Sequence, residues 1–303
     1  MKTMKRAIVM VLVMLTVSLT SCVRFDKQTL TYRYDAEKDE LRIFQVYERI
    51  SAQGQDGKLT DVEKKELGDV IMGQHTFFFG NWILEYNEKL VKGNIAQSKK
   101  RAHDEPHTAL EKAELELMEQ LVSSIEVENG KFFLNGSNEL CAYQKVSVSN
   151  VSKLVEKTNQ FLSLGIQSTE GLSGDAFSQE GKAQIRKFFE TTNCLELKGN
   201  QFIVHFPMSH ENFSKMRKDL TEAKSKGEPD LLLSLLEEDF DMSYEEPIMQ
   251  VVVGGKYSKQ TEIEADKLQE GEYNTLVLNH VRENFTLEED VDVDKLRREF
   301  LGG

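Results

Sequence analysis

The chain has 303 residues, enough for one large domain or two smaller ones, and 51 Asp and Glu against 38 Lys and Arg give it a formal net charge of -13. This charge argues against a nucleic-acid-binding protein and against electrostatic attachment to anionic lipid, because both need a cationic surface. With 39% hydrophobic residues and only 4 Pro, the composition favours a folded body over a disordered tether.

The first 22 residues are organised like a secretory signal. Residues 1–6 (MKTMKR) are cationic, residues 7–19 form an almost unbroken apolar run, and the small residues Thr20 and Ser21 follow. The apolar run is too short to cross a bilayer core, which needs about 20 residues. The sequence therefore predicts that the chain is exported.

The end of this segment, Leu19-Thr20-Ser21-Cys22, resembles the lipobox of bacterial lipoproteins. The resemblance implies that residues 1–21 are removed and that the thiol of Cys22 receives a diacylglyceryl group. Acyl chains such as palmitate would then hold the protein on a membrane of the cell envelope, since each buried methylene contributes about 0.8 kcal/mol. Val23 is compatible with the outer membrane, with the body in the periplasm or at the surface. A signal or membrane-retained helix in which Cys22 is incidental stays open.

Apolar and polar side chains alternate in the residues that follow the signal segment. Residues 24–34 and 39–50 predict an antiparallel hairpin around a polar turn, with aromatic residues on both faces and therefore a cover on each side. Residues 51–60 are expected to form a loop. Thr60 and Glu63 then form a capping box that opens a helix through about residue 73.

The same loop also resembles the second half of a calcium-binding EF-hand. In residues 56–63 (DGKLTDVE), Gly57 would make the bend and Glu63 would be the bidentate ligand. The first and third ligand positions, however, fall on Ala52 and Gly54, which offer no side-chain oxygen. A capped helix explains the same residues without a metal.

Residues 77–82 (FFFGNW) gather four aromatic side chains around a Gly-Asn turn, and we expect them in the core, with a ligand pocket or partner contact as the alternative. Residues 93–104 are polar and basic and are expected to be an exposed connection. Residues 105–124 repeat their apolar positions every three or four residues, which predicts an amphipathic helix.

Two later stretches resemble each other. Residues 125–134 (IEVENGKFFL) and 195–204 (LELKGNQFIV) both predict hairpins, with Asn-Gly and Gly-Asn at the turns. A helix is expected before each hairpin, the second over residues 176–191, and another after each. The sequence thus indicates two helix-hairpin-helix units, with chance similarity as the alternative.

Residues 165–174 are rich in Gly and Ser and are the candidate boundary within the body. The predicted organisation is a signal peptide over 1–21, an N-terminal unit over 22–165 and a C-terminal unit over 166–303, or a single continuous domain. Helices are expected over 229–240 and 292–301, and apolar strands over 247–255 and 273–281. Antiparallel hairpins with packed helices and no β-α-β alternation give an α+β fold class.

No concentrated catalytic signature is present. His103 and His107 are four residues apart, as zinc ligands on a helix can be, but Pro106 lies between them and no zincin-type Glu follows the first. His205 and His210 flank a strand end and a helix start. Cys141 and Cys194 could pair in an exported protein or remain two buried thiols. No catalytic, cofactor-binding or metal-binding residue is assigned, and the one site residue is Cys22.

The sequence favours a non-catalytic lipoprotein of the cell envelope with a structural or binding role. Its expected partners are the membrane, through the lipid on Cys22, and another envelope protein; nucleic acid is not expected. Two alternatives stay open: an envelope hydrolase with scattered catalytic residues and a lipoprotein that captures a small solute. A pocket that gathers His205 or His210 with carboxylates would favour the hydrolase, and thermal stabilisation by a panel of small molecules would favour solute capture, with the aromatic stretch at 77–82 in a cleft.

Overall fold

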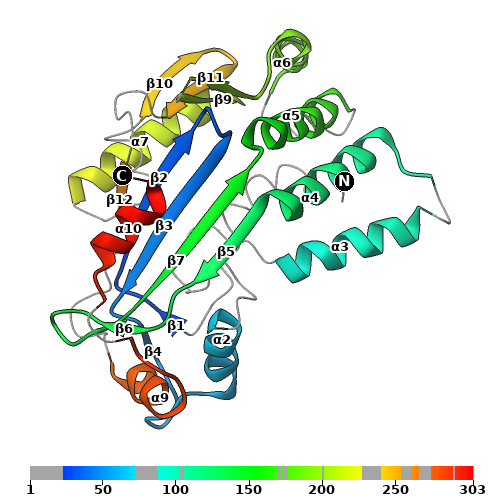
Figure 1. The fold of residues 1–303 in the computed structure, drawn as a ribbon. Coiled ribbons are helices and arrows are strands. Elements are labelled where there is room, and N and C mark those ends of the chain that lie inside the picture. The colour runs from blue at the N-terminus through cyan, green and yellow to red at the C-terminus, as the bar shows by residue number, and fades with distance from the viewer. Residues whose placement is uncertain are drawn as a thin grey trace.

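The computed structural model describes residues 23–71, 88–102, 106–168, 172, 177–199, 201–226, 240–253, 261–265, 274–288 and 291–302. All pairings between its named strands are antiparallel, and helices pack against the sheets, so the fold class is α+β as predicted. Figure 1 shows a long central sheet with a smaller sheet above it and a group of short elements below it.

The central sheet is built on the predicted N-terminal hairpin. In spatial order its strands are β12 (Thr261–Ala265), β2 (Lys27–Asp35), β3 (Glu40–Glu48), β7 (Leu140–Ser149) and β5 (Ile125–Asn129), and the short β6 (Phe133–Leu134) pairs with β7. The hairpin closes with Asp35 opposite Glu40. Four consecutive residues of β3, from Phe44 to Tyr47, are buried, which confirms that both faces of this strand are covered.

The smaller sheet has the order β10 (Phe240–Glu245), β11 (Ile248–Val253), β9 (Gln201–Pro207) and β8 (Leu195–Lys198). The predicted hairpin over residues 195–204 is confirmed, because Lys198 pairs with Gln201 across a turn in which Gly199 has a φ of +61°. The predicted strand over 247–255 is confirmed as β11. A third, two-stranded sheet joins β1 (Val23–Arg24) to β4 (Ser51–Ala52), and β4 lies in the stretch of residues 51–60 that the sequence predicted to be a loop.

The helices are α2 (Asp61–Ile71), α3 (Glu88–Arg101), α4 (Ala109–Ser124), α5 (Val151–Gln167), α6 (Gln179–Thr191), α7 (His210–Lys226), α9 (Leu276–Asn284) and α10 (Val293–Leu301). The capping box at the start of α2 is present: Glu63 accepts from the Thr60 backbone, and Thr60 Oγ accepts from the Glu63 backbone. At α10, the Asp292 carboxylate accepts from Lys295 N at 2.9 Å, so the predicted acidic cap is also confirmed.

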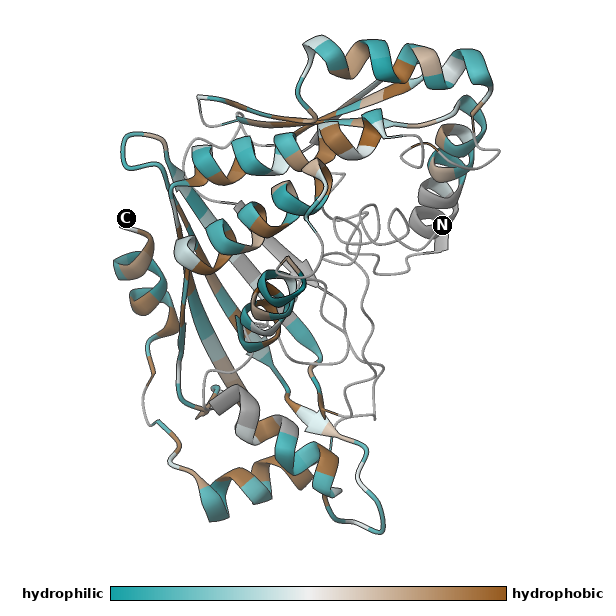
Figure 2. Ribbon diagram, turned by 90° about the vertical axis from the view of Figure 1, so that its right-hand side faces the viewer, coloured by the Kyte–Doolittle hydropathy of each residue, from teal (hydrophilic) through white to brown (hydrophobic). Residues whose placement is uncertain are grey.

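The two faces of the central sheet carry different helices. On one face, Phe44, Val46 and Tyr143 pack with α10 through Leu301. On the other, a larger core containing Tyr47 joins the sheet to α2, α5 and α9. Figure 2 shows α10, next to the C-terminal mark, along one side of the sheet, and Val293, Leu296 and Phe300 of this region pack in the same cluster as Leu301.

Two predicted elements have the wrong type. Residues 93–104 belong largely to α3, because Lys, Arg and Gln favour helices even where the apolar periodicity is weak. Residues 273–281 were expected to form a strand, yet α9 begins at Leu276. Its Val277, Leu278 and Val281 are buried on one side of a helix, a spacing that the run of apolar residues also satisfies.

The first predicted hairpin of the repeat is also wrong. β5 pairs with residues 144–148 of β7, not with residues 131–134, so Asn129-Gly130 is not a two-residue turn. The backbone of β5 continues alongside β7 to Gly130, whose N donates to Tyr143 O at 2.8 Å. A Cβ on Gly130 would clash with the Tyr143 ring. The two hairpins are therefore built differently, and the two related helix-hairpin-helix units are not shown.

The chain does not separate in space at the predicted boundary. Residue 165 lies within α5, which contacts both α4 and β8. Further along the chain, β12 pairs with β2, and α10 packs on β2 and β3. Contacts among the described residues thus cross the predicted boundary, and both the division into units over 22–165 and 166–303 and the single continuous domain stay predictions from sequence.

Several predicted features lie outside the described residues. They are the signal segment with Cys22, the aromatic stretch at 77–82, His75 and His103, and the helix expected over 229–240, of which only Phe240 is described, in β10. Among the described helices, none is long and apolar enough to cross a membrane.

Candidate functional site

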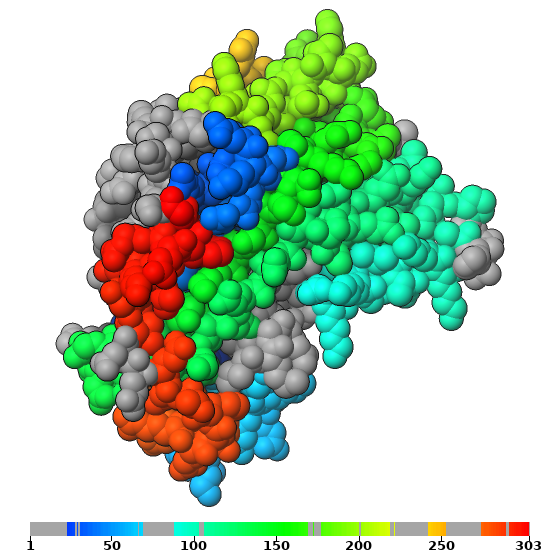
Figure 3. Space-filling model, in the orientation of Figure 1, coloured from blue at the N-terminus to red at the C-terminus, as the bar shows by residue number. Residues whose placement is uncertain are grey.

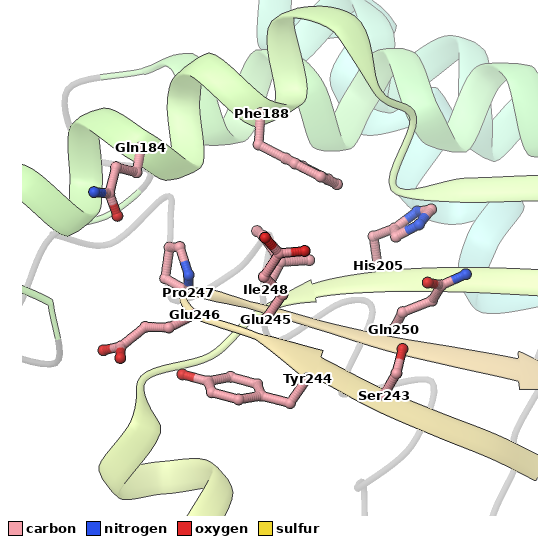
Figure 4. Close-up of a pocket in the computed structure, with 10 residues that line it drawn as sticks. All are labelled: Gln184, Phe188, His205, Ser243, Tyr244, Glu245, Glu246, Pro247, Ile248 and Gln250. Atoms are coloured by element: carbon pink, nitrogen blue, oxygen red, sulfur yellow. The ribbon is translucent and has the colours of Figure 1, made fainter.

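A pocket of about 670 Å³ lies between α6 and one face of the smaller sheet (Figure 4). Gln184 and Phe188 of α6 form its upper wall. His205, Ser243, Glu245, Ile248 and Gln250 come from three adjacent strands and form its floor. Tyr244, Glu246 and Pro247 complete the lining at the end where β10 turns into β11. We call this cavity the α6 pocket.

Strand register explains why these floor residues share a face. Gln250 of β11 lies directly between Ser243 of β10 and His205 of β9, and Glu245 lies opposite Ile248. Because side chains alternate along a strand, residues at every second position of three paired strands point to the same side. The result is a row of three polar side chains beside a carboxylate and an aliphatic residue.

The buried side chains of α6 hold this helix against the smaller sheet. Ile185 and Phe189 pack with Cys194 and Ile248 in a core of their own. The helix begins after Ser178, whose hydroxyl accepts from Gly181 N. Phe188 is carried by the same helix, and its ring meets the ring of His205 edge-on with the centroids 5.6 Å apart.

His205 is held by the backbone beside it. Its Nδ1 lies 3.0 Å from the carbonyl oxygen of Asn193, and a carbonyl only accepts hydrogen bonds. Nδ1 therefore carries a hydrogen in this arrangement, and in the neutral ring Nε2 is an acceptor. We assign this tautomer from the hydrogen-bond partner.

The two carboxylates of the pocket differ in direction. In Figure 4 the carboxylate of Glu245 rises from the sheet into the middle of the group, below Phe188, whereas that of Glu246 points outward, away from the other side chains. Within the described part of the chain, neither carboxylate forms an ion pair. Glu245 is consequently the negative group available to a ligand inside the cavity.

Tyr244 has a structural role at the edge. Its ring stacks on Phe213 of α7 with the centroids 4.3 Å apart, and its hydroxyl donates to Met208 O at 3.2 Å. Burial, and then the nearby charge of Glu246, raise the pKa of Tyr244. The phenol therefore stays protonated at neutral pH and ties β10 to the start of α7.

Of the two histidines that the sequence singled out here, the pocket includes only His205. His210 is the first residue of α7, with its ring 6.0 Å from that of Tyr244, on the side where Tyr244 meets α7. A pocket whose lining includes His205 together with Glu245 and Glu246, as the hydrolase alternative requires, is thus present.

The cysteines are free, so the disulfide that the sequence left open does not form. Cys141 lies under α10 on the central sheet, and Cys194 lies in the core below α6. Burial raises the pKa of each thiol to about 12. Both side chains act as small apolar core residues.

The candidate metal ligands have protein partners. His107 Nε2 lies 3.1 Å from Ser98 O, and the Glu63 carboxylate accepts from Gly54 N as well as from Thr60. Among the described residues, no three His, Cys, Asp or Glu side chains gather in a metal-binding group.

Sequence reasoning did not find the residues from β10 and α6 in this site. A signal for β10 exists, because residues 242–245 (MSYE) alternate before the Glu246-Pro247 turn. Nothing in the sequence of α6 marks Gln184 and Phe188 as pocket residues.

Comparison with family models, curated proteins and solved structures finds no match for this chain.

Proposed function

We propose that this chain is a lipid-anchored lipoprotein of the bacterial cell envelope whose folded body has a binding role. The observation that carries the anchor is the cationic, apolar and lipobox order of residues 1–22, ending in Leu19-Thr20-Ser21-Cys22. The α6 pocket supports the binding role, because it brings polar and aromatic side chains together around a cavity of a size that small ligands occupy.

Replacing Cys22 with serine tests the anchor. We expect Cys22→Ser to abolish incorporation of a labelled fatty acid and to move the protein from the membrane fraction to the soluble fraction, since no thioether-linked lipid can then form. Metabolic labelling and fractionation of cells that express each variant measure both effects. Cys194→Ser makes the same substitution at a buried thiol and should leave labelling intact. Undiminished membrane retention of Cys22→Ser would refute the anchor.

Lipidation at Cys22 would also orient the body. Val23 follows Cys22 directly, is fully buried and pairs with Ala52, so no flexible linker separates the lipid from the fold. Consecutive Cα atoms are only about 3.8 Å apart. The end that carries β1, β4, α2 and α9, at the bottom of Figure 3, would then lie at the bilayer, with α6 at the far end.

A fluorescent reporter can test this orientation. Val62 of α2 is 58% exposed and Glu180 of α6 is exposed, so Val62→Cys and Glu180→Cys can each be labelled, whereas Cys141 and Cys194 are buried with raised pKa values. In liposomes that hold the lipidated protein, quenchers in the lipid headgroups should quench the Val62→Cys reporter several-fold more strongly than the Glu180→Cys reporter. Equal quenching at both positions would contradict the proposed orientation but not the proposed lipid anchor at Cys22.

The α6 pocket supports binding more than hydrolysis. A catalytic histidine is ordinarily oriented by a hydrogen bond that one ring N–H donates to a carboxylate or a backbone carbonyl, and its other ring nitrogen must reach a nucleophile or water. His205 donates from Nδ1 to the carbonyl of Asn193 and packs against Phe188, but among the described residues its Nε2 forms no hydrogen bond to a nucleophile. The side chains around it therefore offer recognition, through acceptors and an aromatic ring.

A further inference from the structure

We propose that the α6 pocket binds a small organic cation, a molecule with a protonated amine or guanidinium group on a compact apolar body. This inference rests on the binding role proposed above and is independent of the anchor at Cys22. It follows from the charge, the apolar wall and the hydrogen-bonding groups of the pocket.

The negative charge of the pocket favours a positively charged ligand. Two carboxylates line the pocket, and its described lining contains no Lys or Arg. Charges in a cleft with low-dielectric walls act more strongly than the same charges on an open surface. A cationic group near Glu245 gains an opposite charge that no ion pair within the described residues already satisfies, whereas an anion there meets repulsion from Glu245.

The apolar wall of the pocket favours a ligand that carries a small hydrophobic group beside its charge. Phe188 forms the upper wall, above the Glu245 carboxylate, and Ile248 is buried in the floor (Figure 4). An ammonium or guanidinium group within about 6 Å of an aromatic ring is attracted by the negative face of that ring. A ligand that carries its charge next to a small hydrophobic group can therefore reach the carboxylate and the apolar surface together.

The remaining lining groups suit a donor of several hydrogen bonds. The neutral His205 tautomer has Nε2 as an acceptor, and Ser243 and Gln250 each provide an oxygen that accepts. Ammonium and guanidinium groups have only donors and can use each of these acceptors, whereas Ser243 and Gln250 can also donate, so the preference for a cation over an acid or a phosphate comes from Glu245. The cavity volume of about 670 Å³ falls within the range of small-molecule sites.

Three ligands of one shape test the charge requirement: benzylamine, benzyl alcohol and benzoate, which are cationic, neutral and anionic at pH 7. Each is titrated into the full-length protein in detergent micelles and followed by ligand-observed NMR. We expect benzylamine to bind with a Kd at least tenfold lower than that of benzyl alcohol, and benzoate to show no binding.

Two variants with the same change of net charge locate the site. Glu245→Gln should weaken benzylamine binding about tenfold, which corresponds to about 1.4 kcal/mol. Glu246→Gln should change the affinity less than twofold, because its carboxylate points away from the cavity. Both residues are exposed, so neither variant should unfold the protein.

The inference is overturned if benzylamine does not bind at millimolar concentration, if benzyl alcohol or benzoate binds as well, or if the two variants behave alike. Binding of benzyl alcohol alone, lost in Phe188→Ala, would indicate a neutral apolar ligand. It would keep the proposed binding role while rejecting the cation. Lipid labelling at Cys22 is unaffected by any of these results and is judged separately.

Discussion

Replacing Phe44 with alanine is expected to lower the free energy of unfolding by about 3–5 kcal/mol. Phe44 has no solvent exposure. Its ring stacks on Tyr143 with the centroids 5.7 Å apart and tilts against Phe300 at 6.3 Å. Loss of the ring leaves a cavity between the central sheet and α10, because the paired strands β2, β3 and β7 cannot move together to fill it. Urea unfolding followed by circular dichroism measures the change.

Phe300→Ala provides the comparison within the same cluster. Phe300 is only partly buried, on the side of α10, so its removal should cost about 1–2 kcal/mol, less than half of the Phe44→Ala effect. Hydrogen exchange should also show faster exchange of the α10 amides in Phe44→Ala. A loss below about 1 kcal/mol for Phe44→Ala, or equal losses for the two variants, would mean that α10 does not seal this face of the sheet.

The sequence predicts α10 well as a helix but says nothing of where it packs. Its start follows from Asp292, whose carboxylate caps the first turn. Its position depends on Arg33 and Arg42, which lie opposite each other on β2 and β3 and donate to carbonyl groups at the end of α10. The two like charges are neighbours in the sheet and share the negative end of the helix dipole. Such a contact, across more than 250 residues of sequence, cannot be read from local patterns.

The Asn-Gly and Gly-Asn pairs of the two similar stretches, 125–134 and 195–204, also show that local patterns do not reveal long-range contacts. Gly199 is needed for its positive φ in a tight turn, which local sequence rules predict. Gly130 is needed because the Tyr143 ring lies against it, and that requirement arises only after β5 and β7 have paired. Two similar motifs therefore serve different purposes, and the symmetry expected from sequence is weaker in the structure.

The sequence predicted only part of the α6 pocket, because most of its lining depends on tertiary structure. The sequence marks His205 as a residue at a strand end and suggests that carboxylates beside it would matter. Which carboxylate lies there depends on the register of β9, β11 and β10, and the strand β10 was not predicted. The upper wall depends on how α6 packs through Ile185 and Phe189, which tertiary structure alone determines.

Replacing Glu63 with alanine is the second change with a large expected effect, a loss of about 2–4 kcal/mol in the free energy of unfolding. Glu63 is 1% exposed. Its Oε1 accepts from Gly54 N at 3.0 Å, and its Oε2 accepts from Thr60 N at 2.6 Å and from Thr60 Oγ at 2.9 Å. Alanine leaves these donors without the carboxylate in a place that water reaches poorly, and it detaches the loop before α2 from the helix.

The chain has a matched control in the capping box of α4. There Glu111 is half-buried and makes the same pair of hydrogen bonds to Thr108, both at 3.0 Å, but these bonds are exposed to solvent, so water can replace the lost acceptor. Glu111→Ala should therefore cost only about 0.5–1 kcal/mol, and urea unfolding of both variants gives the difference that burial makes. Equal losses would show that Glu63 acts only as an ordinary cap. Repeating the measurement with millimolar calcium also tests the EF-hand alternative, because a calcium ligand at Glu63 would make the wild-type protein more stable with calcium and the Glu63→Ala variant indifferent to it.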